Sequence, residues 1–313
     1  MVKLITPASS INRALDQIGD KWCLLIIQEV YWGITSFNEM LAATGVSKGV
    51  LSDRLKWLVS LDCLRKETQS ESVQRPRYHL TKKSMDLYST ALAALNWERI
   101  YYSTPDLDAV KLVHTNCGKV FVPKMQCRTC DEVIDVRDTA YNAGPGAQQD
   151  HREKKVRRRS SIPISDVPNA HSLYKNLIDL VGDRWTSNLI ALSFHGLKRF
   201  DEFHIELPVA TNILAGRLKF LVEEAIFEQR AYQDRPIRYE YHLTEKGRNL
   251  FPWFLALLQW GDKWCDPTGA GRPVNVTHTS CNSLLTGEMK CSECDGLLKA
   301  HEVSYAFNGA DKD

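Results

Sequence analysis

The sequence repeats itself once, and the repeat includes its cysteines. Gly19-Asp20-Lys21-Trp22 recurs as Gly182-Asp183-Arg184-Trp185, displaced by 163 residues. Further along, a set of histidine and cysteine residues recurs with a displacement of 164 residues: His114, Cys117, Cys127 and Cys130 return as His278, Cys281, Cys291 and Cys294. Two copies of one architecture in one polypeptide make a covalent pseudo-dimer, so the fold must be one that can be built twice.

Composition limits the class of protein. A chain of 313 residues that is 43% hydrophobic and 25% charged can bury two cores, and its net charge of +2 leaves any nucleic-acid affinity to local clusters. The longest apolar runs are too short to span a membrane. No secretory signal opens the sequence, so nine cysteines favour thiolates and metal over disulfides, and we expect a cytoplasmic protein.

Helical periodicity in the first repeat predicts a helix-turn-helix. Apolar residues step with helical spacing through residues 11–18 and 24–28, and a short helix begins near Phe37. Ser47 is a plausible N-cap for the next helix, whose buried stripe is Leu51, Leu55 and Leu58. Two strands around a basic tip then predict a wing, and an amphipathic helix over residues 87–102 closes the unit. The second repeat follows the same plan with a longer wing.

These patterns predict an α+β, mainly α fold with five parts. Residues 1–104 form the first winged helix-turn-helix domain and residues 163–267 the second. Each is followed by a small β zinc-ribbon-like module, at residues 105–147 and 268–313. Residues 148–162 form a basic linker, which is either solvated or a phosphate-binding or minor-groove-binding arm.

The ordered motifs resemble the HxlR family of bacterial winged helix-turn-helix transcription regulators. The resemblance covers about residues 9–100 and 172–262, and it is carried by residues 11–22, 37–40, 50–56 and 78–81 and their counterparts in the second repeat. It implies DNA binding, and it implies that the tandem chain corresponds to a joined pair of single-domain subunits. Many members carry a reactive cysteine before the first helix; Ser9 and Ser172 stand there instead, so we expect the familiar redox switch to be absent.

Double-stranded DNA is the expected partner. The outward residues of the second helix in each motif would enter the major groove, and basic wing tips would meet phosphate or the minor groove. Asn212 can pair with adenine whereas its counterpart Gly49 reads no base, so an imperfect palindrome or composite site is expected. Arg54 and Arg217 are equally compatible with a structural ion pair or with a phosphate contact. The predicted DNA-binding residues are Ser47, Lys48, Gly49, Ser52, Lys56, Arg75, Arg77, Thr211, Asn212, Ala215, Lys219, Arg235 and Arg238.

The histidine and cysteine sets predict two structural zinc sites. Three thiolates and one imidazole in two knuckles suit closed tetrahedral zinc, and we expect each repeat to supply one complete set: His114, Cys117, Cys127 and Cys130 in the first, and His278, Cys281, Cys291 and Cys294 in the second. Short strands at residues 120–122 and 133–136 would hold the first pair of knuckles. A redox dithiol or ordinary packing is the alternative. Cys23, Cys63 and Cys265 are not repeated and are expected to be core or surface thiols.

Two other function classes stay open. The winged helices could bind protein and the ribbons dock a partner in a transcription complex, or oxidation could eject zinc from a thiol sensor. An enzyme is not expected: the His204-Ile205-Glu206 sequence lacks the Pro-Cys-x-x-Cys that a zinc deaminase requires. Pairing with a second copy through the helices of Trp97 and Trp260, any small-molecule effector, the operator and the direction of regulation are not disclosed by the sequence.

Overall fold

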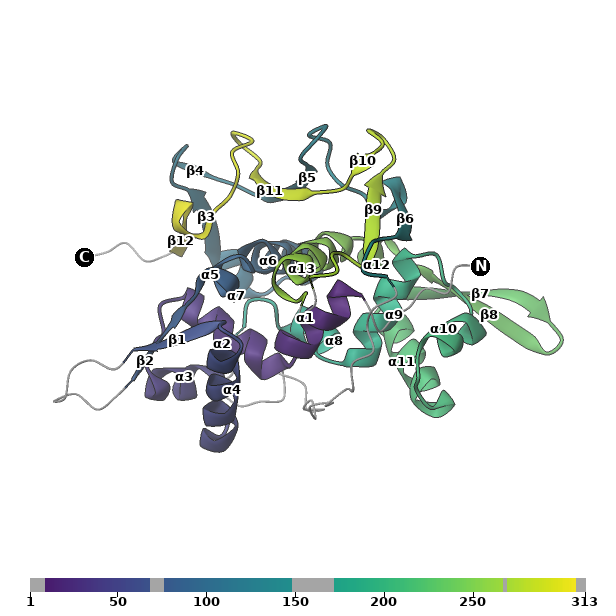
Figure 1. Cartoon of the computed structure of the whole chain (residues 1–313), viewed down its shortest axis with the longest axis horizontal. Helices are drawn as coiled ribbons and strands as arrows, with labels where there is room; N and C mark the ends of the chain where they lie inside the picture. Colours follow the sequence, from purple (N-terminus) through teal and green to yellow (C-terminus); the bar gives the residue numbers. More distant parts are fainter. Residues whose placement is uncertain (1–8, 68–75, 148–171, 267–268, 308–313) are drawn as a thin grey trace. The chain divides into compact units, whose positions relative to one another are not determined.

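The computed structural model describes residues 9–67, 76–147, 172–266 and 269–307 (Figure 1). The chain divides into two compact units, and each unit draws on both repeats. We call the one that contains most of the first repeat the N-unit (residues 15–123, 156–183 and 290–313). The other is the C-unit (residues 1–14, 124–155 and 184–289).

The N-unit contains a winged helix-turn-helix. Asp20 caps the first of its long helices by accepting a hydrogen bond from the Trp22 backbone N–H (3.2 Å), and Ser47 caps the helix that follows the turn. The polar cap residues satisfy backbone donors that would otherwise lack partners, which fixes where these helices begin. The elements are α2 (Lys21–Tyr31), α3 (Phe37–Thr44), α4 (Lys48–Ser60), β1 (Leu64–Glu67), β2 (Arg77–Leu80), α5 (Lys82–Met85), α6 (Tyr88–Tyr101) and α7 (Pro105–Ala109).

The C-unit repeats this plan with a longer wing. Its two wing strands have eight and seven residues, against four and four described in the N-unit. The elements are α9 (Arg184–Phe194), α10 (Phe200–Glu206), α11 (Thr211–Glu223), β7 (Phe227–Asp234), β8 (Ile237–Leu243), α12 (Glu245–Arg248) and α13 (Phe251–Trp264). The predicted helix-turn-helix and wing are therefore present in both units.

The start of the first repeat's first helix, and the whole first helix of the second repeat, belong to the unit of the other repeat. The start of α1 (Ser10–Ile18) belongs to the C-unit, where the Ser10 hydroxyl donates to Asp262 on α13 (2.5 Å). Helix α8 (Lys175–Val181) belongs to the N-unit, where the Leu177 backbone N–H donates to Glu98 on α6 (2.7 Å). Segments of the two repeats are thus exchanged.

The β modules are exchanged in the same way. In the N-unit, β3 (Val110–His114) pairs with β4 (Lys119–Val120) and with β12 (Val303–Phe307) from the end of the chain. In the C-unit, β9 (Val274–His278) pairs with β10 (Ser283–Leu284) and with β6 (Thr139–Ala143) from the first repeat (Figure 1). Strands β5 (Pro123–Cys127) and β11 (Gly287–Cys291) contain the points at which the chain passes between units. The 3-10 turns η2 (Val136–Asp138) and η4 (Ala300–Glu302) precede β6 and β12.

The expected strand over residues 133–136 is wrong. Val133 makes only an isolated bridge to Gln126, and the Asp135 side chain accepts from the Arg137 backbone N–H and starts the η2 turn. A side chain that satisfies its own backbone competes with strand pairing, which explains the turn.

The apolar stripes lie in the cores. Leu51, Leu55 and Leu58 on α4 are at most 1% exposed, and their counterparts on α11 are fully buried. Trp97 and Trp260 are also buried. No helix among the described residues is both long and apolar enough to cross a membrane.

Candidate nucleic-acid interface and metal centres

The first turn of α4 presents small polar and basic groups to solvent. Ser47, Lys48, Gly49 and Lys56 are exposed, and Ser52 is half-buried one turn along. The Ser47 hydroxyl accepts from the Val50 backbone N–H (3.4 Å), as the cap prediction required. The buried leucine stripe holds the opposite face of the same helix, so these groups point away from the core.

Helix α11 presents its counterpart surface without a side-chain cap. Thr211, Asn212, Ala215 and Lys219 are exposed. Ala210 stands where Ser47 stands in the N-unit and makes no capping hydrogen bond. The Lys219 ammonium lies 3.6 Å from the Glu223 carboxylate, an exposed pair of the kind that contributes little to stability and leaves the lysine available.

Arg54 is a structural residue. Its guanidinium donates to both carboxylate oxygens of Asp20 (2.9 and 3.1 Å), and the residue is 9% exposed. Burial acts to lower the pKa of Arg54, but the hydrogen bond and charge of Asp20 outweigh it and raise that pKa. Of the two interpretations left open by the sequence, the ion pair is therefore the one that the structure contains.

The wings carry exposed arginines. Arg77 pairs with Glu67 at the end of the described N-unit wing strands nearest the tip, and its guanidinium donates to the Thr35 hydroxyl (3.1 Å). In the C-unit, Arg235 and Arg238 are exposed near the tip, and Arg238 lies 3.9 Å from the Asp201 carboxylate. Arg75 and the basic linker lie outside the described residues.

The eight predicted metal ligands form two clusters, but the expected grouping by repeat is wrong. His114 and Cys117 meet Cys291 and Cys294 in the N-unit, and Cys127 and Cys130 meet His278 and Cys281 in the C-unit. Each cluster combines one knuckle from each repeat. This follows from the strand pairing, because β3, which ends at His114, pairs with β12 of the second repeat, and β9, which ends at His278, pairs with β6 of the first repeat.

The ligand atoms of each cluster converge. In the N-unit, His114 Nδ1 lies 3.2 Å from Cys294 Sγ and 3.5 Å from Cys117 Sγ, and the Cys117 and Cys291 sulfurs are 4.0 Å apart. All four ligand atoms lie within 4.8 Å of one another.

The C-unit cluster repeats these distances. His278 Nδ1 lies 3.3 Å from Cys130 Sγ and 3.5 Å from Cys281 Sγ, and the Cys127 and Cys281 sulfurs are 3.9 Å apart. Either cluster could hold a metal ion.

Each knuckle has a turn residue that the sequence analysis missed. Gly118, Asp131, Asn282 and Asp295 each follow the second ligand of a knuckle, and each has φ between 53° and 69°. The Asp131 N–H donates to the Cys127 carbonyl (2.9 Å), which closes the turn and points both thiols inward. Glycine, asparagine and aspartate adopt this left-handed conformation most readily. Their recurrence directly after the second cysteine or histidine of each knuckle is therefore a sequence pattern that predicts the turn.

Close packing shifts the pKa values of neighbouring thiols in opposite directions. In the C-unit cluster, burial raises the pKa of Cys281, but the hydrogen bond to His278 and others outweigh it and lower that pKa to about 6. The pKa of Cys130 is raised to about 11: a backbone hydrogen bond from Glu132 lowers it, but burial and the neighbouring thiols Cys127 and Cys281 outweigh that effect. Thiols this close suppress one another's ionisation, and a cation among them would remove that conflict.

The three cysteines that are not repeated lie in the cores. Cys23, Cys63 and Cys265 are buried and form no disulfide. Burial raises the pKa of the Cys63 thiol to about 11, which leaves it protonated and unreactive at neutral pH.

A family model described as HxlR-like helix-turn-helix matches residues 17–105 and 180–269. The two matches fall on the two winged motifs and together cover more than half of the chain.

Individual relatives match one repeat's length. An uncharacterized HTH-type transcriptional regulator of Mycobacterium tuberculosis is 32% identical over 137 residues, which are 44% of this chain and 87% of the relative. The HTH-type transcriptional regulator YodB of Bacillus subtilis is 34% identical over 94 residues, 30% of this chain and 84% of YodB. Among solved structures, PA1607, a candidate transcription factor, is 30% identical, covers 41% of this chain and 89% of its own, and has a TM-score of 0.37.

Proposed function

This chain belongs to the HxlR-like helix-turn-helix family, and on that premise we propose that it regulates transcription by gripping one DNA duplex with two winged-helix heads. The observation that carries the proposal is the exposure of the first turns of α4 and α11, with their leucine stripes buried beneath. Family membership implies double-stranded DNA as the ligand. The two-headed grip and the residues that make it are our inference.

The two heads differ in what they offer to bases. Asn212 presents an amide that can bond an adenine edge bidentately, while Gly49 at the same position presents only backbone. We propose as base-reading or positioning residues Ser47, Lys48, Gly49, Ser52 and Lys56 in one head and Thr211, Asn212, Ala215 and Lys219 in the other. The operator is then an imperfect palindrome or a composite site, with unequal half-sites.

The wings supply the sequence-independent part of binding. Arg75 and Arg77 in one wing and Arg235 and Arg238 in the other would contact phosphate or the minor groove. Each such contact releases counterions, so its loss should reduce the dependence of log K on log salt by about one.

The two clusters suit zinc. Tetrahedral zinc with sulfur ligands at about 2.3 Å separates two sulfurs by roughly 3.8 Å, close to the 3.9 and 4.0 Å found here. Three thiolates and an imidazole complete the coordination shell, so the ion would have no open position for substrate and would act only in structure. We propose that one such ion stabilises each ribbon-like module. We also propose that the five-part division of the chain holds for the order of its segments along the sequence, while each zinc ion binds residues of both repeats.

DNA binding is tested by fluorescence anisotropy with genomic fragments at two salt concentrations. Asn212→Ala should lower affinity for the preferred fragment and leave affinity for random DNA unchanged. Ser292→Ala, in the N-unit ribbon, is the matched control and should change neither. A protein that binds every fragment with one affinity, or none, contradicts the proposed operator binding and favours the protein-docking alternative.

A thiol sensor is the second candidate, and one observation favours it. Cys294 is exposed although it belongs to a cluster, so oxidants can reach that sulfur. Peroxide should then release metal and abolish DNA binding together. Metal retention under peroxide that oxidises the half-buried Met85 would rule this candidate out. Association of two chains into a homodimer is a separate proposal, tested by mass in solution.

A further inference from the structure

The two winged-helix heads carry different charges at equivalent surface positions. At the displacement of 163 residues, four cations of the N-unit head correspond to neutral or acidic residues in the C-unit head. The cations are Lys48, Arg65, Lys66 and Arg77, and their counterparts are Thr211, Glu228, Gln229 and Glu240. All of these side chains are exposed except Glu240, which is half-buried, so the differences concern the surface and not the core.

The stem of the N-unit wing, formed by β1 and β2, is basic. These strands hold three lysine or arginine residues and one acid, Glu67. Arg65 lies 3.5 Å from Glu67, and Arg77 pairs with Glu67 in the strand register. Lys48 and Lys66 are exposed and lie in no ion pair among the described residues. The stem and the start of α4 therefore present an excess of positive charge to an external anion.

In the C-unit wing, the cations over the equivalent positions pair with the protein's own acids. Glu228 accepts a hydrogen bond from Arg230 (2.9 Å), and Glu240 accepts one from Arg199 (2.9 Å). A guanidinium that is paired with a carboxylate adds little net charge to the surface. This stem therefore presents no excess of positive charge, and the exposed arginines near the tip carry what positive charge the wing offers.

We propose that the N-unit head anchors the protein on the phosphate backbone, with Arg65 and Lys66 as phosphate contacts, while the C-unit head supplies base contacts and little electrostatic affinity. This inference rests on the proposed binding of DNA and adds these two residues to it. Each cation that meets a phosphate releases counterions, whereas an acid at the same place is repelled by the backbone. A basic stem fits the backbone of any sequence, and Asn212 in the C-unit head offers its amide to a base edge.

The test exchanges side chains between the heads of the full chain and follows DNA binding by fluorescence anisotropy between about 50 and 200 mM salt. Lys48→Thr with Lys66→Gln gives the N-unit head the residues of the C-unit head. At about 0.9 per phosphate contact, the slope of log K against log salt should become shallower by about 1.8, so this variant should lose roughly 12-fold less affinity than wild type over that range. The reverse exchange, Thr211→Lys with Gln229→Lys, should steepen the slope, a gain that misfolding cannot produce.

Two further variants serve as controls. Lys219→Gln with Arg230→Gln removes two exposed cations from the C-unit head and should change the slope by no more than about 1, because Arg230 is already paired with Glu228. Lys111→Gln removes an exposed lysine from β3, outside the head, and should leave the slope unchanged.

The outcomes separate this inference from the proposed function. Wild-type protein that binds no DNA fragment contradicts both. If wild-type protein binds DNA, an N-unit exchange or a reverse exchange that leaves the slope unchanged overturns this inference alone. So does a C-unit double variant that lowers the slope as much as the N-unit exchange does.

Discussion

The exchanged metal clusters can be tested by pairing cysteine substitutions in two ways. Cys117→Ala with Cys294→Ala removes two ligands from the N-unit cluster and leaves the C-unit cluster complete. Cys117→Ala with Cys130→Ala removes one ligand from each cluster. The first pair should retain about one zinc ion per chain, and the second should retain none under mild chelation.

The expected size follows from the ligand count. A structural zinc site with four ligands binds with about 10–16 kcal/mol, so one ligand contributes roughly 3 kcal/mol, or about 100-fold in affinity. A chelator of intermediate affinity therefore strips three-ligand sites and spares intact ones. Zinc is then counted by mass spectrometry of the dialysed protein.

Because each cluster combines residues of both repeats, a bound metal ion should contribute more to the free energy of unfolding than it would in a cluster made by one repeat. The ion in the N-unit cluster would link Cys117 to Cys291, which are 174 residues apart, whereas Cys117 and Cys127 of one repeat are ten apart. By loop-closure entropy the longer link constrains the unfolded chain by about 2.5 kcal/mol more. Removing zinc should lower the free energy of unfolding by correspondingly more than an isolated ribbon would lose.

One outcome would refute this reasoning directly. If the pair at Cys117 and Cys130 keeps one zinc ion and the pair at Cys117 and Cys294 keeps none, each repeat binds its own ion and the exchange is wrong. Cys23→Ala, at a buried cysteine outside both clusters, is the control and should leave the zinc count at about two.

Further predictions concern single residues. Asp20→Asn leaves the buried Arg54 guanidinium with only the exposed Asp53 carboxylate (2.8 Å) as a charge partner. It should lower the free energy of unfolding by about 1.5–3 kcal/mol in urea titrations, the usual contribution of hydrogen bonds to a charged group; an unchanged midpoint would contradict the buried pair. Gly261→Ala places a Cβ 2.3 Å from the Ser10 carbonyl oxygen and should lower the free energy of unfolding by about 1–3 kcal/mol. Gly216→Ala, whose Cβ would have nothing within 4 Å, should raise the free energy of unfolding by up to about 1 kcal/mol. Equal shifts in melting temperature for the two variants would refute the contact. Burial lowers the pKa of His195 to about 4, which means that the unfolded chain binds more protons between about pH 6.5 and pH 4, so stability falls as the pH drops through that window. His195→Phe should reduce this loss, and parallel pH profiles of variant and wild type would count against it.

Local features of this chain were predictable from sequence because short-range chemistry decides them. Ser47 caps α4 as expected, and the leucines at positions 51, 55 and 58 are buried as their spacing required. The sequence also indicated which histidine and cysteine side chains would gather into clusters that could hold a metal ion, because knuckle spacing of these residue types is typical of metal sites. The strand expected over residues 133–136 failed because Asp135 bonds its own backbone, a competition that apolar patterning does not register.

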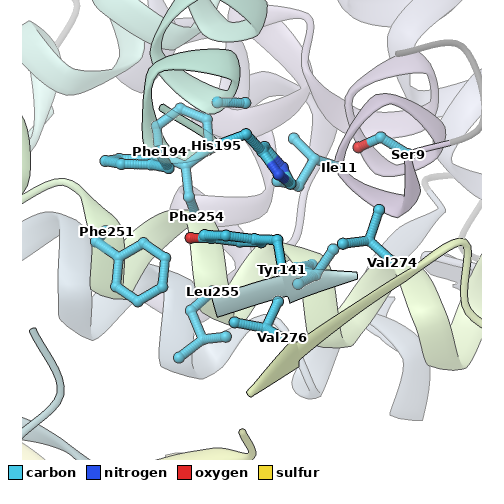
Figure 2. A pocket seen from close by; sticks show the side chains of 12 residues that line it. Ser9, Ile11, Tyr141, Phe194, His195, Phe251, Phe254, Leu255, Val274 and Val276 are labelled. Carbon is cyan, nitrogen blue, oxygen red and sulfur yellow. The ribbon is translucent and has the colours of Figure 1, made fainter. Parts of the chain in front are cut away.

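The sequence by itself determined that the same winged motif and the same ligand spacing occur twice. It could not determine which copy each segment joins, because β12 and β6 have identical roles and nearly equivalent partners in both repeats, and no local interaction distinguishes them. Tertiary packing made that choice: His114 lies beside Cys294, and His278 beside Cys130. Packing alone also decided that Trp32 lies against Tyr305 in one unit, whereas His195, its counterpart in the other repeat, lies against Tyr141 (Figure 2) with a buried Nδ1 atom that has no hydrogen-bond partner among the described residues.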